Sequence, residues 1–513
     1  MSRAPRIVVI GAGVGGLAAA ARLAALGAEV EVLEQAATPG GKMRAVAVGD
    51  SYIDVGPTVL TMRWAFEELF AAVGADFASA VPLKRAETLA RHFWRDGGEL
   101  DLYDDVERSA EAIRAFAGPR EAQGYLAFAR DAERAFRALD ASFIRAGRPN
   151  LPQLVARIAR HDPRDLFAFS PFADLWSALQ RYFRDPRLLQ LFGRYATYCG
   201  ASPFAASATL MLVAHVEREG VWVIEGGLRR LARALAALAE GAGARIRYDC
   251  KVTRLVVEGG RVGGVETSQG ERIAAQAVVY NGDVGALAAG LIGGAPAVAL
   301  SGPSLSAVTW ALRAPKAGAP WRHHNVLFGD DYAQEFDAVF RRNALPRDPT
   351  IYICAQEREA GASTSADEPL FVLVNAPPHR PEAPLSEGEI ATCEQATREA
   401  ARRLGVSLDL AGAVRTTPRD FAALFPGSRG ALYGPPPHGW RASFQREGAR
   451  ASPPGLYLAG GTVHPGAGVP MAALSGALAA AAVWADLGST ARSGRAATRG
   501  GTSTRSATTG STG

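Results

Sequence analysis

The sequence has 513 residues, of which 48% are hydrophobic and 21% charged, and its formal net charge is +5. A chain of this length can bury two or three domain cores without disulfide or metal staples, and its four scattered cysteines form no CxxC pair, as expected in a reducing cytoplasm. The positive charge is spread among acidic residues instead of forming one basic run, so we expect no nucleic-acid partner.

The first part of the chain has the pattern of a strand, a helix and a second strand. Residues 6–10 form a continuous apolar run, residues 17–26 are an Ala-rich helical segment, and residues 29–33 return to a strand pattern. A βαβ unit of this kind predicts an α/β fold with a Rossmann-type dinucleotide-binding domain.

The turn between the first strand and the helix carries the motif Gly-Ala-Gly-Val-Gly-Gly. Gly11 permits the tight turn, Gly13 lets the backbone approach a pyrophosphate, and Gly16 allows the helix to pack closely on the strand. The phosphates then lie at the positive end of the helix. Glu34 ends the second strand, where its carboxylate can accept both ribose hydroxyls and disfavours the 2′-phosphate of NADP.

After the βαβ unit the chain has a long helical segment and then a series of strand patterns. Residues 64–216 are mostly helical and aromatic, with Pro and Gly breaks that indicate an inserted cap. Strand patterns follow at residues 244–248, 252–258, 261–267, 277–280, 351–355, 370–374 and 456–458, and an Ala-rich helix ends near residue 487.

These elements predict a discontinuous cofactor domain and an inserted α+β substrate domain. The cofactor domain would take residues 1–65, 217–295 and 411–488, and the substrate domain residues 66–216 and 296–410, the first part largely helical. Residues 489–513 have almost no apolar side chains and cannot form a core, so we expect a disordered tail.

A second glycine motif distinguishes FAD from NAD. Gly40 and Gly41 follow the second strand and let the backbone wrap the pyrophosphate from another side, while Lys42 or Arg44 neutralises it. This arrangement resembles the glycine-pair motif of the amine oxidase and carotenoid desaturase superfamily of flavoproteins, where arginine usually stands at the position of Lys42. A lysine keeps the charge and loses the bidentate fork.

The same resemblance extends to three later segments. It implies that Gly56, Pro57 and Thr58 pass close to the isoalloxazine ring of FAD and that the backbone of Val252 contacts the adenine. The glycine-rich loop near the end resembles the C-terminal signature of bacterial carotenoid desaturases, which implies flavin contacts for Gly460, Gly461, Val469, Pro470 and Met471. Amine oxidases carry an acidic residue where this chain has Gly461, so the desaturase alternative is favoured.

Within that family, residues 192–200, 209–216, 220–222 and 225–227 resemble the proteobacterial hydroxyneurosporene desaturases. The resemblance implies 3,4-desaturation of acyclic 1-hydroxycarotenoids such as 1-hydroxyneurosporene, in carotenoid biosynthesis. A phytoene desaturase, a carotenoid isomerase and an amine oxidase are alternatives of the same class. A prenyl- or lipid-binding module of the same fold without redox activity, as in the Rab GDP-dissociation inhibitors, is the alternative from another class, and the intact Gly40-Gly41 pair argues against it.

The resemblance also implies the chemistry. A desaturation removes a hydride and a proton, and because no side chain accepts a hydride, the flavin must take it and be reoxidised by a separate acceptor such as oxygen or a quinone. No catalytic base can be assigned; His464, in the flavin-proximal loop, and His215, on an apolar helical pattern, are weak candidates. His323 and His324 have no third ligand at suitable spacing, so we expect no metal.

Carotenoids dissolve in bilayers, which raises the question of membrane contact. Residues 154–192 interleave aromatic side chains with arginines, a composition that predicts peripheral docking at the inner membrane; a packed helix pair is the alternative. The most apolar long stretch, residues 467–487, is mostly Ala and Gly and is interrupted by Pro470 and Asp486, so we expect no spanning helix.

Overall fold

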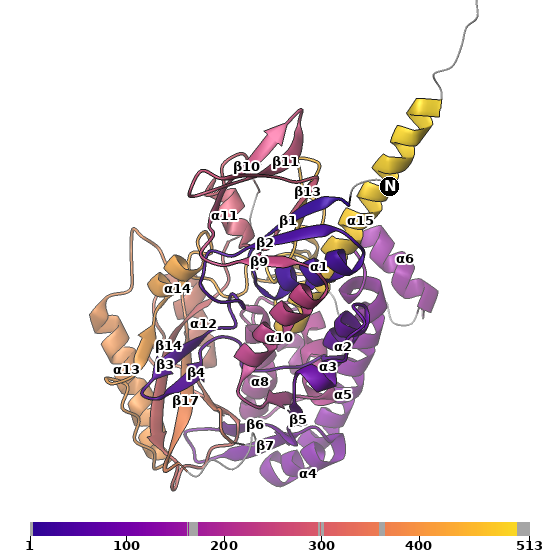
Figure 1. The fold of residues 1–513 in the computed structure, drawn as a ribbon. Helices are drawn as coiled ribbons and strands as arrows, with labels where there is room; N and C mark the ends of the chain where they lie inside the picture. The colour runs from indigo at the N-terminus through magenta and orange to yellow at the C-terminus, as the bar shows by residue number, and fades with distance from the viewer. Residues whose placement is uncertain are drawn as a thin grey trace, which may run out of the picture.

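The computed structural model describes residues 4–161, 163, 173–295, 298, 302–358 and 365–499. One half of the molecule is built on a five-stranded parallel sheet in the order β19-β13-β1-β2-β9 (Figure 1). Its strands are β1 (Arg6–Ile10), β2 (Glu29–Leu33), β9 (Arg245–Arg247), β13 (Ala277–Tyr280) and β19 (Leu456–Leu458). Since they come from separated parts of the chain, the sheet forms only when distant segments meet.

Both faces of this sheet are covered. Ile7 and Val9 point into a layer formed by helices α1 (Val14–Ala25), α10 (Leu228–Gly241) and α15 (Val469–Arg499). Val8 and Ile10 face the antiparallel meander of β10 (Val252–Glu258), β11 (Arg261–Thr267) and β12 (Arg272–Ala274). Burial on both faces explains why β1 is a continuous apolar run instead of an alternating one.

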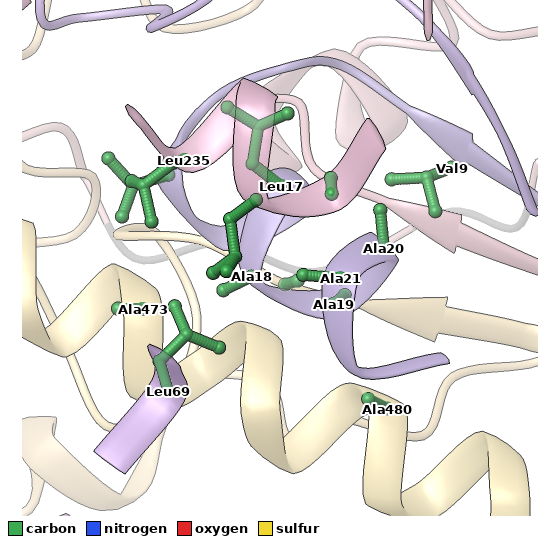
Figure 2. Packing of buried hydrophobic residues seen from close by; sticks show 14 of the residues in the cluster. Val9, Leu17, Ala18, Ala19, Ala20, Ala21, Leu69, Leu235, Ala473 and Ala480 are labelled. Carbon is green, nitrogen blue, oxygen red and sulfur yellow. The ribbon is translucent and has the colours of Figure 1, made fainter. Parts of the chain in front are cut away.

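Helices α1 and α15 lie against each other through small side chains. Figure 2 shows Ala18 to Ala21 of α1 near Ala473 and Ala480 of α15, with Leu17, Leu69 and Leu235 closing the cluster. A Cβ atom added to Gly476 would lie 2.1 Å from the carbonyl oxygen of Gly15. The glycine at position 476 therefore lets the last helix approach the first turn of α1.

The end of α15 differs from the expectation. The helix continues to Arg499, past residue 487 and into the segment expected to be disordered. Residues 489–499 include alanines and arginines, which have high helix propensity. Residues 500–513 of the predicted tail lie outside the described residues.

The other half of the molecule is a seven-stranded mixed sheet in the order β18-β14-β17-β16-β15-β6-β7. Its strands are β6 (Thr88–Phe93), β7 (Glu99–Tyr103), β14 (Ser306–Pro315), β15 (His324–Leu327), β16 (Ile351–Ala355), β17 (Asp367–Ala376) and β18 (Val414–Thr416). Helix α13 (Glu387–Arg403) covers one face, and the hairpin of β3 (Ala45–Val48) and β4 (Ser51–Asp54) packs on the other.

Two parts of this sheet correct the sequence prediction. β6 and β7 lie inside the segment expected to be largely helical, and β18 lies beyond residue 410, where the substrate domain was expected to end. β6 pairs in parallel with β15, and β18 pairs with β14. Both pairings join residues far apart in the chain, which local sequence patterns do not show.

The cap between the sheets is helical. It contains α2 (Arg63–Ala71), α3 (Phe77–Ala80), α4 (Val106–Ala117), α5 (Pro119–Leu139), η1 (Asp140–Ile144), α6 (Leu151–His161), α7 (Leu175–Leu179), α8 (Pro186–Gly193), η3 (Arg194–Cys199), η4 (Ala208–Met211) and α9 (Leu212–Glu219). Its core is rich in aromatic rings, such as Phe183 stacked on Phe192 at 4.6 Å. Val59 and Met471, from the two predicted flavin segments, pack against this same core.

Shorter elements connect the halves. They are β5 (Leu83–Arg85), which pairs with β8 (Trp222–Ile224), then α11 (Val284–Ala288), α12 (Tyr332–Asp337), η5 (Ala338–Arg342), α14 (Pro418–Leu424) and η6 (Ala442–Phe444).

Candidate functional site

The first glycine turn has the geometry of an anion site. Gly11 adopts a φ of +98°, and α1 begins at Val14 after Gly13, which gives the helix no side-chain cap among the described residues. A Cβ atom on Gly16 would lie 2.1 Å from the carbonyl oxygen of Gly11. The first N–H groups of α1 are therefore left for an external acceptor, at the positive end of the helix dipole.

Glu34 lies beside this turn. Its buried carboxylate accepts hydrogen bonds from the backbone N–H of Ala12 at 2.6 Å and of Ala36 at 2.8 Å. The backbone carbonyl of Glu34 accepts the N–H of Cys250, two residues before Val252 at the start of β10. The structure thus brings Glu34 and Val252, the residues predicted to contact the adenosine, to the same edge of the sheet.

The glycine pair packs directly on the first turn. Gly40 forms a parallel bridge with Gly13, and its N–H donates to the carbonyl oxygen of Ala12 at 2.9 Å. Gly40 and Gly41 have φ values of +120° and +58°, and a Cβ atom on Gly41 would lie 3.4 Å from Gly13 Cα. Both glycine motifs therefore converge on one place, although they are separated in the sequence.

Asn281 and the C-terminal loop complete the cradle. The Nδ2 group of Asn281 donates to the carbonyl oxygen of Ala459 at 3.0 Å, while its buried Oδ1 atom has no hydrogen-bond partner in the described part of the chain. A Cβ atom on Gly13 would lie 2.8 Å from this Oδ1, and one on Gly15 would lie 2.8 Å from the N atom of Gly460. The glycines keep open a space that any side chain would fill.

The predicted cations have partners within the chain. Lys42 Nζ donates to the carbonyl oxygen of Leu432 at 2.8 Å and lies 3.9 Å from Asp283 Oδ2, and burial lowers its pKa. Arg44 donates to Thr416 Oγ1 at 3.0 Å. Both side chains tie the glycine pair to the segment around β18 and α14, and their role in neutralising a pyrophosphate stays a prediction.

The segment from Gly56 to Thr58 leads from the cradle to the cap. Gly56 is fixed by close contact, because a Cβ atom there would lie 2.0 Å from the carbonyl oxygen of Lys42, and Pro57 follows it. Thr58 Oγ1 lies 2.8 Å from the hydroxyl of Tyr352, which lies 2.7 Å from His324 Nδ1. A line of hydrogen-bonded side chains therefore runs from this segment into the seven-stranded sheet.

A buried arginine that the sequence did not single out holds the C-terminal loop. Arg446 is 6% exposed and donates to the carbonyl oxygens of Gly461 at 3.0 Å, Tyr433 at 3.1 Å and Pro435 at 2.7 Å. After this loop α15 begins at Val469, with Val469 and Pro470 buried and Met471 turned to the cap core. Only a long-range contact map could have identified Arg446, since no motif surrounds it.

The two candidate histidines differ in their surroundings. His464 Nε2 lies 2.8 Å from the carbonyl oxygen of Ala146, so Nε2 carries the proton, and its buried Nδ1 has no partner within the described residues. His215 contacts Arg218 at 2.9 Å through Nδ1 and stacks near Phe136, and burial lowers its pKa to about 4. His215 is thus a packed side chain of α9, whereas His464 lies in the predicted flavin loop.

The pair His323 and His324 acquires a third neighbour in the fold. Cys354 Sγ lies 3.6 Å from His323 Nε2, a proximity that sequence spacing could not show. Burial raises the pKa of Cys354 to about 12, which keeps the thiol protonated and able to donate to His323. The expectation that no metal binds here stays a prediction.

Asp54 connects the predicted flavin segment to helix α10. Its buried carboxylate accepts the backbone N–H of Leu228, the first residue of that helix, where Gly227 provides no side-chain cap. Burial raises the pKa of Asp54 to about 6, against the opposing effects of Leu228 and Arg229. Asp54 therefore takes the place of a local N-cap, from a strand distant in sequence.

This raised pKa predicts a pH-dependent stability. The folded protein binds the proton of Asp54 more tightly than the unfolded chain does. The stabilisation of the fold by protonated Asp54 is therefore fully present below about pH 4 and is lost as the pH rises to about 6. The free energy of unfolding of the wild type, relative to Asp54→Asn, should fall by roughly 2–3 kcal/mol over that range. Urea unfolding of both proteins between pH 4 and 7 measures it.

Asp76→Asn is the matched control. Asp76 caps α3, and its pKa is lowered by hydrogen bonds from Ser79, so its contribution is lost only below about pH 4 and should stay nearly constant between pH 4 and 7. A constant difference between wild type and Asp54→Asn across this pH range would contradict the prediction.

A cavity lies among helices α2, α5 and α9 of the cap and strand β8. It has a volume of about 410 Å³ and is lined by Met62, Trp64, Phe136, Val216 and Trp222, with Arg63, Glu67, Glu219 and Gly220 also contributing. The lining combines apolar rings with a few charged groups, as in a site for a long hydrocarbon.

Comparisons with known proteins agree with this site. The family model described as flavin containing amine oxidoreductase matches residues 14–484. Hydroxyneurosporene desaturase from Rubrivivax gelatinosus is 50% identical, covering 99% of this chain and 98% of that protein, and the enzyme of the same name from Rhodobacter capsulatus is 44% identical, covering 94% and 98%. The chain belongs to the carotenoid desaturase family, within the flavin-containing amine oxidoreductases.

Solved structures show the same fold at low identity. Putrescine oxidase bound to putrescine superimposes with a TM-score of 0.60 at 13% identity, covering 94% of this chain and 99% of that one. An oxidoreductase from Methanosarcina mazei gives a TM-score of 0.54 at 16% identity, covering 92% and 99%.

Membership of this family makes the protein an FAD-dependent oxidoreductase. The site fits that cofactor: the glycine turns leave a cradle that a Cβ atom would fill, and Asn281 Oδ1 is buried in it without a partner among the described residues. In this desaturase family member, Gly11, Gly13, Gly16, Gly40 and Gly41 would hold the pyrophosphate, with Glu34 at the ribose, and these assignments stay predictions.

Proposed function

We propose that this protein introduces the 3,4 double bond into acyclic 1-hydroxycarotenoids such as 1-hydroxyneurosporene, in carotenoid biosynthesis. The observation that carries the proposal is the identity of 44–50% over nearly the whole chain with three enzymes named hydroxyneurosporene desaturase. The glycine at position 461, where amine oxidases carry an acidic residue, supports it.

In the proposed reaction a hydride leaves one carbon and a proton leaves its neighbour, and a carbon–carbon double bond forms between them. FAD, when bound, supplies the acceptor for the hydride and passes two electrons to a separate oxidant such as oxygen or a quinone. The chain would hold the polyene in place against this acceptor, and the cavity lined by Met62, Trp64 and Phe136 offers apolar rings for that contact.

The proton requires an acceptor in the chain or in solvent. His464 offers Nδ1, which carries the lone pair because Nε2–H donates to the carbonyl oxygen of Ala146. Burial lowers the pKa of His464, so the ring is neutral and able to take a proton at neutral pH. We assign His464 as the candidate base of this loop.

Product analysis tests the function. Purified protein with FAD is supplied with 1-hydroxyneurosporene or with phytoene in liposomes, and the products are separated by chromatography. We expect a product with one further conjugated double bond from the hydroxylated substrate. Conversion of phytoene alone would replace the proposal with a phytoene desaturase, and a change of geometry without loss of hydrogen would indicate an isomerase.

We also propose peripheral contact with the inner membrane through helix α6. Of the segment 154–192, residues 162 and 164–172 lie outside the described residues, and the aromatic side chains of Trp176, Tyr182 and Phe183 pack in the cap core instead of on the surface. Leu151 and Val155 of α6 are 43% and 42% exposed and lie one turn apart.

Helix α6 therefore carries the membrane proposal. Leu154 and Ile158 face the cap core, which leaves Leu151 and Val155 outward, and Arg160 of the same helix is also exposed; this combination suits an anionic lipid surface. By length and composition one helix could cross a membrane, Val469–Ser489 with a mean hydropathy of 1.4, but it packs against α1.

Flotation with anionic liposomes tests the contact. The double variant Leu151→Ser/Val155→Ser should lose binding, while Val257→Ser/Val414→Ser, which changes two equally exposed apolar residues elsewhere, should keep it. Equal flotation of both variants would contradict a role for α6.

A further inference from the structure

A buried polar cluster lies in the aromatic core of the cap. It consists of Arg194, Tyr195 and Tyr198 of η3 with Glu217 of α9. The hydroxyls of Tyr195 and Tyr198 each donate to one carboxylate oxygen of Glu217, the second at 2.6 Å. Arg194 Nη1 donates to the hydroxyl of Tyr198 at 2.8 Å. The cluster thus holds one guanidinium in a fixed position, away from water.

Two nitrogen atoms of the Arg194 guanidinium donate no hydrogen bond to the described part of the chain. The residue is 6% exposed, and its Nε and Nη2 atoms have no hydrogen-bond partner within the described residues. Nη2 lies 3.7 Å from Glu217 Oε1, an ion pair without a hydrogen bond. Arg194 Cζ lies 5.1 Å from the centre of the Tyr195 ring and 5.3 Å from that of the Tyr198 ring, and these rings stabilise its charge. The rings provide no hydrogen-bond acceptor atom for Nε and Nη2, and because a buried N–H group left unbonded costs about 1–3 kcal/mol, these donors indicate an external acceptor.

The cluster lies next to the predicted flavin-facing segments. Burial lowers the pKa of His324, and the charges of His323 and Arg194 act in the same direction. The hydroxyl of Tyr352 lies 2.7 Å from His324 Nδ1 and 2.8 Å from Thr58 Oγ1, so it connects these two side chains. Tyr198 also packs on the same apolar core as Val59 and Met471. Tyr198, whose hydroxyl accepts a hydrogen bond from Arg194, therefore shares one buried core with residues beside the predicted flavin segments.

A substrate oxygen would satisfy these donors. In a 1-hydroxycarotenoid the tertiary hydroxyl is two carbons from the 3,4 bond, so when that bond lies at the reactive end of the site, the oxygen lies among the adjacent side chains. A hydroxyl oxygen accepts hydrogen bonds, and a guanidinium offers several donors in a rigid plane. A pure hydrocarbon end would leave the same donors buried and unbonded.

We propose that Arg194, oriented by Tyr198 and Glu217, donates hydrogen bonds to the terminal hydroxyl oxygen of the polyene and so selects hydroxylated over unmodified ends. This inference rests on the proposed desaturase function. It makes Arg194 a specificity-determining residue, since a site that provides buried donors for a hydroxyl discriminates against the analogue that lacks it.

The test compares kcat/KM for 1-hydroxyneurosporene and neurosporene in the wild type and in Arg194→Lys. Lysine keeps a cation beside Glu217 and loses the planar fork. We expect the preference for the hydroxylated substrate to fall by about 10- to 100-fold, with little change for neurosporene. FAD content and unfolding temperature are measured for each protein.

Arg91→Lys is the matched control. Arg91 of strand β6 likewise lies beside a buried carboxylate, and it differs in being fully hydrogen-bonded to it: its Nε and Nη2 donate to Asp101 at 2.7 and 2.8 Å. The control should keep the wild-type preference. If Arg194→Lys does not hold FAD, Tyr198→Phe replaces it, because this change removes only the hydroxyl that orients Arg194; the preference should then fall by about 3- to 10-fold.

The outcomes separate the two proposals. A wild type that desaturates neither substrate, or phytoene alone, overturns the proposed function whatever the variants do. A wild type that prefers the hydroxylated substrate, with variants of Arg194 and Tyr198 that keep this preference or lose activity equally on both substrates, overturns the role of Arg194 alone.

Discussion

Gly16→Ala should yield a protein that no longer binds FAD. The new Cβ atom would lie 2.1 Å from the carbonyl oxygen of Gly11 and 2.9 Å from Asn281 Oδ1. Gly11 is itself fixed by the turn, and Asn281 is bonded to the carbonyl oxygen of Ala459, so neither can retreat without opening the cradle. Overpacking of a core commonly costs about 1–3 kcal/mol, and a clash with backbone belongs at or above the upper end.

The measurement is the ratio of flavin absorbance to protein after purification, together with the unfolding temperature. Gly241→Ala is the control, because Gly241 ends helix α10 with open space around its Cβ position. That variant should keep FAD and be as stable as the wild type or slightly more stable. A stoichiometric flavin content in Gly16→Ala would contradict the structure of the turn.

Arg446→Met should separate the C-terminal loop from the cofactor site. Methionine fills a similar volume and removes the donors that bind three backbone carbonyls, those of Gly461, Tyr433 and Pro435. Each buried carbonyl left without a partner costs roughly 1–3 kcal/mol. The free energy of unfolding should therefore fall by several kcal/mol, and FAD affinity should fall with it, because the loop that begins at Gly460 loses its anchor.

Urea unfolding and titration with FAD measure the two effects. Arg446→Lys provides a graded comparison, since one ammonium can bond one or two of the carbonyls but cannot span all three, and it should lie between the wild type and Arg446→Met. Equal stability of all three proteins would show that the carbonyls find other partners.

The sequence predicted those elements whose pattern is local. β1, β2, β10, β11, β13, β16 and β19 have the bounds that the apolar runs and glycine turns indicate. β6 was not predicted, because Arg91 and His92 interrupt its apolar pattern and their environment comes from β15 and the salt bridge to Asp101. Tertiary contacts of this kind stabilise a strand at positions where the local sequence pattern does not predict one.

The candidate cofactor site likewise combines residues that a local motif predicts with residues that only the fold brings together. The glycines of the first turn and Glu34 could be found because a dinucleotide turn requires these residue types at fixed spacing. Arg446, Asn281 Oδ1 and the cluster around Arg194 could not, because each acts through partners brought in from other elements. For Lys42 and Arg44 the motif predicted the position beside the glycine pair. It could not predict their hydrogen bonds to Leu432 and Thr416, because these residues are distant in the sequence.

The contact between α1 and α15 has a consequence for the order of folding. The first turn of α1 is synthesised more than 400 residues before Gly476, on which it packs. Strand β13, which pairs with the central strand β1, and the edge strand β19, which pairs with β13, are also synthesised after β1. We therefore expect the predicted FAD cradle to be complete only after α15 has left the ribosome, and a polypeptide interrupted before α15 to expose an unfinished, apolar sheet to aggregation.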